Sequence, residues 1–219
     1  MSVLSSTDVA HPAIEALFTI DEETGMTGAM ELEKGILKGT ILLNLDTEDD
    51  DEFSIGCAGG IDTNTKYTYT KEAIIAGNQT YTITVNGLNG GHSGVQINEE
   101  LGNANKIMNR LMYGSEEYNL QIVDINGGSL RNAIPRESFA TIAVNPSYLK
   151  DLEERIQAIK EEYSIQDPNL SIRVEATSQA DKAMSLADTK KVTTALYAVH
   201  NGVFRFSRAI EGLVETSSS

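Results

Sequence analysis

The sequence is poor in cysteine, tryptophan and positive charge. Cys57 is the only cysteine among 219 residues and tryptophan is absent, so no internal disulfide can form and no zinc site built from thiolates is available. Lysine and arginine number 17 against 32 aspartates and glutamates, a net charge of −15. An acidic excess of this size repels nucleic acid and anionic membranes. We therefore expect neither as a partner.

Long apolar runs and histidines are also scarce. No stretch reaches the roughly 18 apolar residues of a membrane helix, and the first residues lack the basic segment and apolar core of a secretory signal. Together with the single thiol, these absences favour a reducing compartment, so we expect a cytoplasmic protein. The only histidines are His11, His92 and His200.

The chain is organised around an acidic turn that follows an apolar segment. Residues 13–20 read as a mostly buried strand and end in Asp21-Glu22-Glu23, and Thr24–Leu37 carries apolar residues at helical intervals. In an open α/β sheet, ligands bind beyond the carboxyl ends of the strands. We therefore expect the three acids at the mouth of a crevice.

A second apolar segment, Thr40–Leu45, also ends in an acid, Asp46. A parallel βαβ unit brings both carboxyl ends to one edge, so Glu22, Glu23 and Asp46 are expected to converge. Clustered carboxylates repel one another unless a cation neutralises them, which indicates a divalent metal. Oxygen ligands alone leave magnesium, calcium and zinc open. The alternative is a solvated acidic turn and an unrelated aspartate.

A change of pattern follows Gly56–Gly60, a glycine-containing segment able to act as a hinge. We expect a domain boundary there, with a partial α/β domain over residues 1–61 and an α+β domain over 62–219. The second domain alternates short strands with amphipathic helices in the order β-α-β-β-α-β, which is typical of a ferredoxin-like sandwich. The expected strands are Lys66–Thr70, Thr80–Val85, Leu120–Ile125, Phe139–Val144 and Leu170–Val174, and the expected helices are Asn103–Met112, Tyr148–Tyr163 and Lys182–His200.

Two glycine-rich turns in the second domain are candidate binding loops. Leu88–Gly94 places His92 between glycines at the end of a strand, where an imidazole would be exposed and available. A surface histidine in a flexible loop is the alternative. Asn126–Arg136 is a long polar turn in which two arginines flank an apolar pair, a feature that turn chemistry does not explain.

Taken together, these segments resemble the zinc metallopeptidase superfamily that includes carboxypeptidase G, and most closely its Xaa-His dipeptidase (aminoacyl-histidine, carnosinase-like) branch. The matching segments are Thr19–Met26, Leu43–Asp46, Gly56–Gly60, Gly90–Gly94, Gly102–Lys106 and Leu130–Glu137. They occur in the family's order and cover nearly the whole chain.

The resemblance implies a two-domain enzyme with two zinc ions and a lid that hydrolyses dipeptides with C-terminal histidine. By analogy, Glu22 is the general base that takes a proton from a metal-bound water, Glu23 ligates one zinc and Asp46 the other. His92 and Asn132, on the lid, contact the substrate when the lid closes.

The sequence also departs from the family pattern. A His-x-Asp metal motif, a metal-bridging aspartate and a ligand histidine near the C-terminus are missing from this chain. We therefore expect an internal fragment, a catalytic-domain remnant followed by a truncated lid, that does not retain zinc and is inactive by itself. One alternative is an association module that forms a homodimer through strand edges or lid helices. Another is a related N-acyl amino acid deacylase or tripeptidase.

Overall fold

The computed structural model describes residues 2–22, 25–45, 51 and 56–219. The chain divides into two units, residues 1–65 and residues 66–219. Most of the regular secondary structure belongs to the second unit.

The first unit holds two short helices, α1 (Ser2–Ser5) and α2 (Thr27–Met30), and no strand within its described residues. The expected βαβ unit is therefore not formed, and the expected helix over Thr24–Leu37 is reduced to α2. A local turn precedes α2, in which the amide of Gly25 donates to the carbonyl of Asp21 at 3.1 Å. The hydroxyl of Thr27 donates to the carboxylate of the same aspartate.

The apolar residues of the two expected strands are exposed to solvent. Phe18 is 78% exposed, Ile41 82% and Leu43 76%. A parallel sheet is stable when helices and neighbouring strands cover both of its faces. The described residues of this unit provide neither, so these apolar runs form no sheet there.

The second unit contains a four-stranded antiparallel sheet in the order β4-β6-β2-β7. With α3 between β2 and β4, and α4 between β6 and β7, the chain follows the β-α-β-β-α-β order of a ferredoxin-like sandwich. The expected fold of this part of the chain is confirmed. Its elements are β1 (Glu72–Ala73), β2 (Gln79–Asn86), β3 (Gly91–His92), η1 (Ile97–Glu99), α3 (Ala104–Met112), η2 (Glu116–Tyr118), β4 (Gln121–Gly127), β5 (Ala133–Ile134), β6 (Ser138–Val144), α4 (Tyr148–Glu162), β7 (Ser171–Ala176), β8 (Lys182–Ala183), α5 (Leu186–Ala198), β9 (Gly202–Phe206) and β10 (Val214–Ser218).

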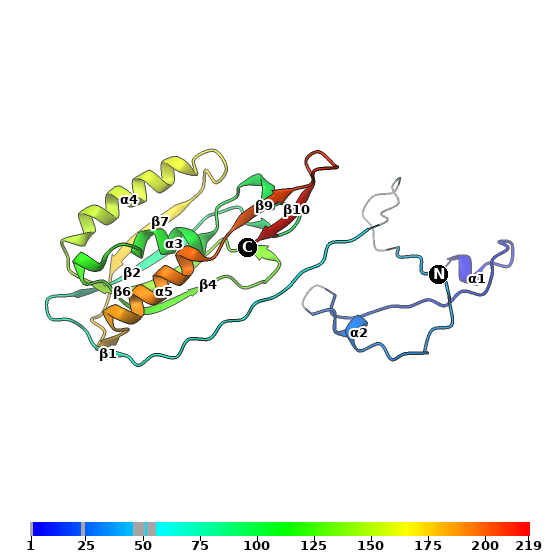
Figure 1. The fold of residues 1–219 in the computed structure, drawn as a ribbon, viewed down its shortest axis with the longest axis horizontal. Coiled ribbons are helices and arrows are strands. Elements are labelled where there is room, and N and C mark those ends of the chain that lie inside the picture. The colour runs from blue at the N-terminus through cyan, green and yellow to red at the C-terminus, as the bar shows by residue number, and fades with distance from the viewer. Residues whose placement is uncertain (1, 23–24, 46–50, 52–55) are drawn as a thin grey trace. The chain divides into compact units, whose positions relative to one another are not determined.

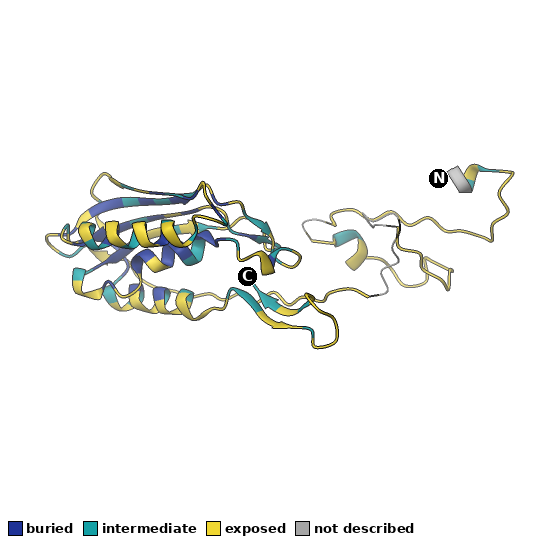
Figure 2. Cartoon of the chain, turned by 90° about the horizontal axis from the view of Figure 1, so that it is seen from above, coloured by how far each residue is buried: buried dark blue, intermediate teal, exposed yellow. Residues whose placement is uncertain are grey.

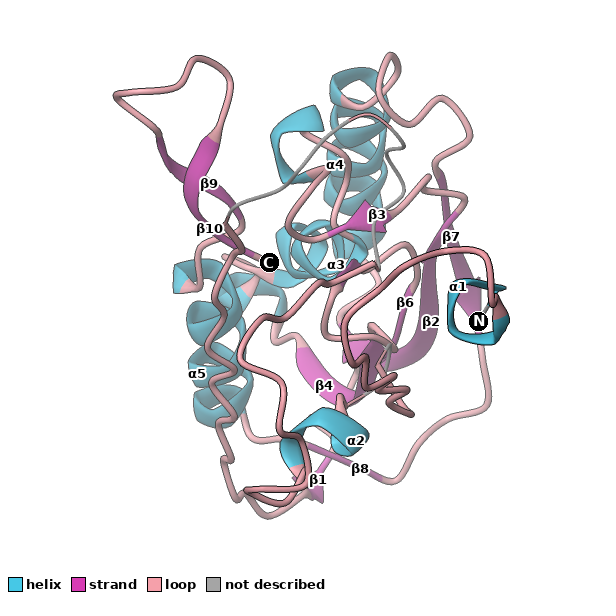
Figure 3. Ribbon diagram, turned by 90° about the vertical axis from the view of Figure 1, so that its right-hand side faces the viewer, coloured by secondary structure: helices cyan, strands magenta, loops and turns pink. Residues whose placement is uncertain are grey.

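Three helices cover one face of this sheet. α3 lies in the middle, between α4 and α5, and the opposite face has no helix on it (Figures 1 and 3). Figure 2 shows the buried residues between the sheet and the inward sides of the helices. Along β2, Tyr81, Ile83 and Val85 point into this core, and Thr82 and Thr84 are only partly buried on the other face. One-sided burial is what period-two alternation in an antiparallel strand predicts.

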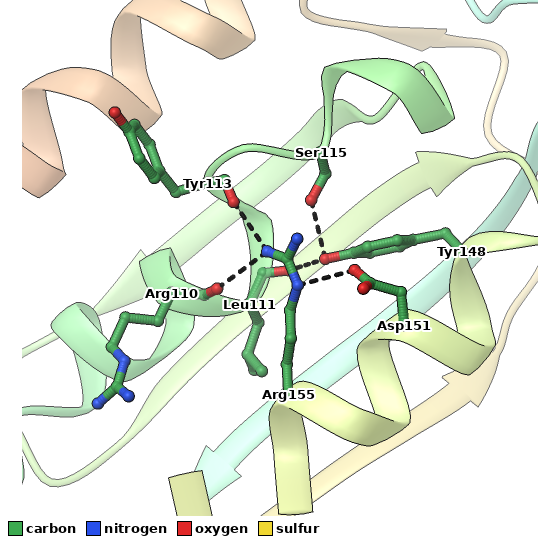
Figure 4. Close-up of polar contacts among 7 residues, drawn as sticks. All are labelled: Arg110, Leu111, Tyr113, Ser115, Tyr148, Asp151 and Arg155. Atoms are coloured by element: carbon green, nitrogen blue, oxygen red, sulfur yellow. Dashed lines mark hydrogen bonds and ion pairs between the residues drawn. The ribbon is translucent and has the colours of Figure 1, made fainter. Parts of the chain in front are cut away.

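The C-terminal end of α3 is held by side chains of α4 (Figure 4). The hydroxyl of Tyr148, which is fully buried, donates to the carbonyl of Leu111 and accepts from the Ser115 hydroxyl at 2.9 Å. Arg155 donates to the carbonyl of Tyr113 at 2.8 Å. These bonds satisfy carbonyls that the end of a helix leaves without partners. Burial raises the pKa of the Tyr148 phenol.

The strand expected at Lys66–Thr70 is not formed, and the first strand of the described residues begins at Glu72. Side-chain contacts hold this segment in place of a strand ladder. The Tyr67 hydroxyl donates to the carboxylate of Asp188 at the start of α5, and the Lys191 ammonium lies 2.9 Å from that hydroxyl. The alternating threonines and tyrosines therefore do not form a strand here. Instead, the Tyr67 side chain holds the segment against α5.

Candidate substrate-binding site

The acidic residues expected to form the catalytic centre are only partly within the described structure. Glu22 is exposed in the turn after Asp21. Glu23 and Asp46 lie outside the described residues. Among the residues that the structure does describe, no group of three or more histidine, cysteine, aspartate or glutamate side chains could hold a metal ion.

The two residues expected to contact the substrate, in contrast, line one cavity of the second unit. Its volume is about 660 Å³, and both His92 and Asn132 are on its wall. The wall combines the loop after β2, the β4–β5 connection and the start of β6. Its other lining residues are Asn89, Gly90, Gly91, Asn126, Gly127, Gly128, Ser129, Leu130, Ala133, Ile134, Pro135, Arg136, Glu137 and Phe139.

Backbone pairing brings the two glycine-rich turns together. β3 and β5 are antiparallel, with Gly91 opposite Ile134 and His92 opposite Ala133. The amide of Ser93 also donates to the carbonyl of Asn132 at 2.9 Å. Residues about forty positions apart in the chain thus form one rim, which the sequence did not indicate.

The imidazole of His92 is held in one tautomer by its own loop. Its Nδ1 accepts hydrogen bonds from the amides of Gly94 at 3.0 Å and Val95 at 3.2 Å. An acceptor nitrogen carries no proton, so the ring proton of the neutral imidazole is on Nε2. The His92 amide donates in turn to Oε1 of Gln96 at 2.9 Å. The exposed ring therefore presents Nε2–H as a donor.

Arg136 crosses the loop at Gly90. A Cβ placed on Gly90, whose φ is +66°, would lie 3.2 Å from Cβ of Arg136. Glycine at this position accommodates both the left-handed backbone and the close approach. Arg136 and Gln96 are members of the site that the sequence analysis did not assign. Arginines flanking an apolar pair were a signal for the first, and nothing in the local sequence pointed to the second.

The cavity is suited to binding an anionic or polarised oxygen atom. Its wall offers the Nε2–H donor of His92, the guanidinium of Arg136 and the amide of Asn132. Donors fixed in advance stabilise negative charge that develops on a substrate oxygen. The wall carries Glu137 as its only acid among the described residues.

A second cavity of about 390 Å³ lies beside the first and is lined by Lys106 and His200. The ammonium group of Lys106 already has hydrogen-bond partners, because it donates to the carbonyls of Leu196 and Val199 at 2.6 Å each, at the end of α5. Desolvation by burial lowers the pKa of Lys106. This lysine therefore caps a helix and is not available for a ligand.

Comparison with known proteins finds relatives whose similarity extends over both units. Residues 75–170 match the peptidase dimerisation domain of M20 peptidases. The cytosol non-specific dipeptidase of Escherichia coli (strain K12) is 43% identical over 223 residues, covering 99% of this chain and 46% of that protein. This chain is therefore similar to the M20 peptidases. The predicted relationship is confirmed, and it extends over nearly the whole chain.

A solved structure supports the same M20 assignment. The aminoacylhistidine dipeptidase of Vibrio alginolyticus shares 42% identity, and its crystal structure superposes with a TM-score of 0.76 over 99% of this chain and 45% of that one. This chain spans about half the length of the relatives that it matches. The two relatives carry different names for their specificity, so similarity to them leaves the substrate open.

Proposed function

We propose that this chain is part of a metal-dependent dipeptidase whose substrates include dipeptides with C-terminal histidine. The identity of 43% along 99% of the chain carries the proposal, and the donor-lined cavity is the structural feature that agrees with it. One relative is named an aminoacylhistidine dipeptidase and the other a cytosol non-specific dipeptidase. On the same basis, we propose that the enzyme acts in the cytoplasm. The described residues contain no helix long and apolar enough to cross a membrane.

We propose residues 62–219 as the lid and residues 1–61 as part of the catalytic domain. Within the lid, His92 donates its Nε2–H to the oxygen of the scissile carbonyl, and Asn132 contacts the substrate on the same wall. The two hydrogen bonds that backbone amides donate to Nδ1 support this role, because they orient the Nε2–H donor before substrate binds. Glu22 as general base and Glu23 and Asp46 as zinc ligands remain part of the proposal.

A chimera tests the proposed activity. In it, this chain replaces the 43%-identical segment of the E. coli dipeptidase. We expect hydrolysis of β-alanyl-histidine, sensitive to a chelator and abolished by Glu22→Gln. A chimera that folds, binds metal and hydrolyses no dipeptide would refute the proposal. The unaltered E. coli enzyme is the positive control.

The 219-residue chain alone is expected to be inactive. It covers 46% of its relative, and its described residues hold no metal-binding group. The same assay with added zinc is the test. Hydrolysis that a chelator and Glu22→Gln both abolish would contradict this expectation. An N-acyl amino acid or a tripeptide cleaved faster than β-alanyl-histidine by the chimera would move the proposal to those substrates.

A second candidate function is homodimerisation through the outer edge of β7. At the outer edge of β4, Ile122 is engaged, because its carbonyl accepts from the amide of Met184 at 2.8 Å and its amide donates to the Thr189 hydroxyl at 3.2 Å. No strand of the described residues covers β7, which ends the sheet. An uncovered edge can pair with an identical edge about a two-fold axis. The match of residues 75–170 to a dimerisation domain agrees with this assignment.

The charges of β7 suit antiparallel pairing of two copies. Arg173 and Glu175 are both exposed, and pairing centred on Val174 would place each opposite the other residue of the second copy. We expect Arg173→Glu and Glu175→Arg each to weaken the dimer in sedimentation velocity, and the double variant to restore it. A chain that stays monomeric at all concentrations would end this second proposal.

A further inference from the structure

The carboxylate of Asp167 lies at the base of the loop that carries His92. Asp167 is 1% exposed and follows α4. Its Oδ1 accepts from the amide of Asn89 at 2.7 Å, and its Oδ2 accepts from the amide of Gly102 at 2.7 Å. These amides stand at the two ends of the loop formed by residues 90–101. One carboxylate therefore holds both ends of the loop.

The position of Asp167 is itself fixed. Its amide donates to the Tyr163 carbonyl at 2.8 Å, and its carbonyl accepts from the Leu170 amide at 2.9 Å. Both bonds belong to the short connection between α4 and β7, so the backbone of Asp167 is anchored to this connection and not to the loop. Within the described residues, no cationic side chain forms a salt bridge with it. Its negative charge is balanced by main-chain donors alone.

Gly102 gives the carboxylate room to approach. A Cβ on Gly102 would lie 2.6 Å from Cδ2 of Leu88 and 3.0 Å from Oδ2 of Asp167. No side chain fits in that space. The loop end is therefore built for close contact between main chain and carboxylate.

We propose that Asp167 is a positioning residue for His92. The loop between its two anchored amides contains the His92 ring, the Gly94 and Val95 amides that hold Nδ1, and Gln96, which holds the His92 amide. Fixing both ends lowers the number of conformations open to this loop. The carboxylate acts on His92 only through the backbone. It keeps the imidazole in place on the cavity wall, and this inference rests on the proposed role of that imidazole.

Asp167→Asn tests the proposal in the 219-residue protein. A carboxamide accepts through one oxygen only, and its amino group faces a second donor, so one end of the loop is released. A lost charge-assisted hydrogen bond corresponds to a change of about tenfold or more in a local equilibrium. We expect hydrogen exchange of the His92, Gly94 and Val95 amides to accelerate by about that factor. The ring nitrogen shifts of His92 should move towards a mixture of tautomers.

Thr189→Val is the matched control. Thr189 is 5% exposed, and its hydroxyl accepts from the amide of Ile122 at 3.2 Å, in a different part of the unit. We expect this variant to accelerate exchange near Ile122 and to leave the His92 tautomer unchanged. The same tautomer shift in both variants, or no loop acceleration in Asp167→Asn, would overturn the proposal. Neither readout needs substrate, so failure of the proposed dipeptidase activity does not affect it.

A measurement on the unaltered protein covers the case in which Asp167→Asn does not fold. Under mild denaturant, amides that open together exchange with one free energy. We expect Asn89 and Gly102 to open together with Gly94 and Val95. Opening of the His92 loop while both Asp167-bound amides stay protected would overturn the positioning role.

Discussion

Replacing Tyr148 with phenylalanine should weaken the contact between α3 and α4. The variant removes one hydroxyl from a fully buried side chain and leaves the ring in place. The Leu111 carbonyl loses its donor and the Ser115 hydroxyl loses its acceptor. Figure 4 shows both partners meeting the same oxygen.

The cost follows from leaving buried groups unsatisfied. A buried polar group without its partner costs about 1 to 3 kcal/mol. Ser115 is 2% exposed, so water does not readily replace the lost acceptor. We expect the free energy of unfolding to fall by about 2 kcal/mol, within the range of that principle.

Urea denaturation followed by circular dichroism measures this change. With a slope of about 2 kcal/mol per molar urea, the midpoint should fall by about 1 M at an unchanged slope. Tyr118→Phe is the control, since its ring lies 4.8 Å from that of Tyr148 and its hydroxyl makes no hydrogen bond within the described structure. The free energy of unfolding of this control should change by less than about 0.5 kcal/mol. Equal shifts in the two variants would refute the reasoning.

The same variant predicts a pH dependence. Because burial raises the pKa of the folded Tyr148 phenol above its ordinary 10.0, the unfolded chain loses this proton first. Stability attributable to the phenol is therefore complete below pH 10 and declines as the pH rises through the folded pKa. The difference between wild type and Tyr148→Phe should shrink above pH 10. A difference that stays constant would contradict this assignment.

Three further predictions concern the loop and two helices. In the active chimera, His92→Asn should lower kcat by about 100-fold with a smaller change in KM, because a pre-oriented donor to the reacting oxygen is lost; an unchanged kcat would exclude this role. Asn103→Ala should cost about 1 kcal/mol in urea denaturation, since its side chain accepts from two amides at the start of α3, whereas Ser147→Ala should cost little, because Ser147 makes no such bond at the start of α4. The hydrogen bond from Arg110 lowers the pKa of Glu162. This pair therefore stabilises the folded state above pH 4.5 and loses its effect as the pH falls through the folded pKa. Because both side chains are well exposed, Glu162→Gln should cost only about 0.5 kcal/mol in the free energy of unfolding at pH 7, and less at low pH.

Local patterns were informative where one face of an element is buried. The alternation of Thr80–Val85 predicted β2, and the apolar stripe of Tyr148–Tyr163 predicted α4 to within a residue. The segments around Phe18 and Leu43 have equally strong apolar runs and form no strand. A strand needs hydrogen-bonding partners and cover from other parts of the chain, and a run of apolar residues does not specify either.

The sequence singled out two residues of the candidate cavity, but it did not indicate their surroundings. His92 between glycines and Asn132 in a polar turn were recognised by resemblance, and both line the same cavity. Arg136 was noticed as an unexplained charge, without an assigned place. Nothing in the sequence indicated the roles of Gln96 and Asp167. Their partners are backbone amides, which every residue except proline provides, so no particular neighbouring side chain marks the interaction.

The sequence by itself determined the β-α-β-β-α-β order of the second unit, since hydrophobic periodicity is a local property that each element carries alone. It also determined the exposed imidazole in a glycine-rich turn. Only the tertiary structure decided that the two turns share one wall, that Nδ1 of His92 is bound by its own loop, and that Asp167 closes that loop. These depend on hydrogen bonds between residues distant in the chain, whose geometry exists only after the sheet and helices have packed.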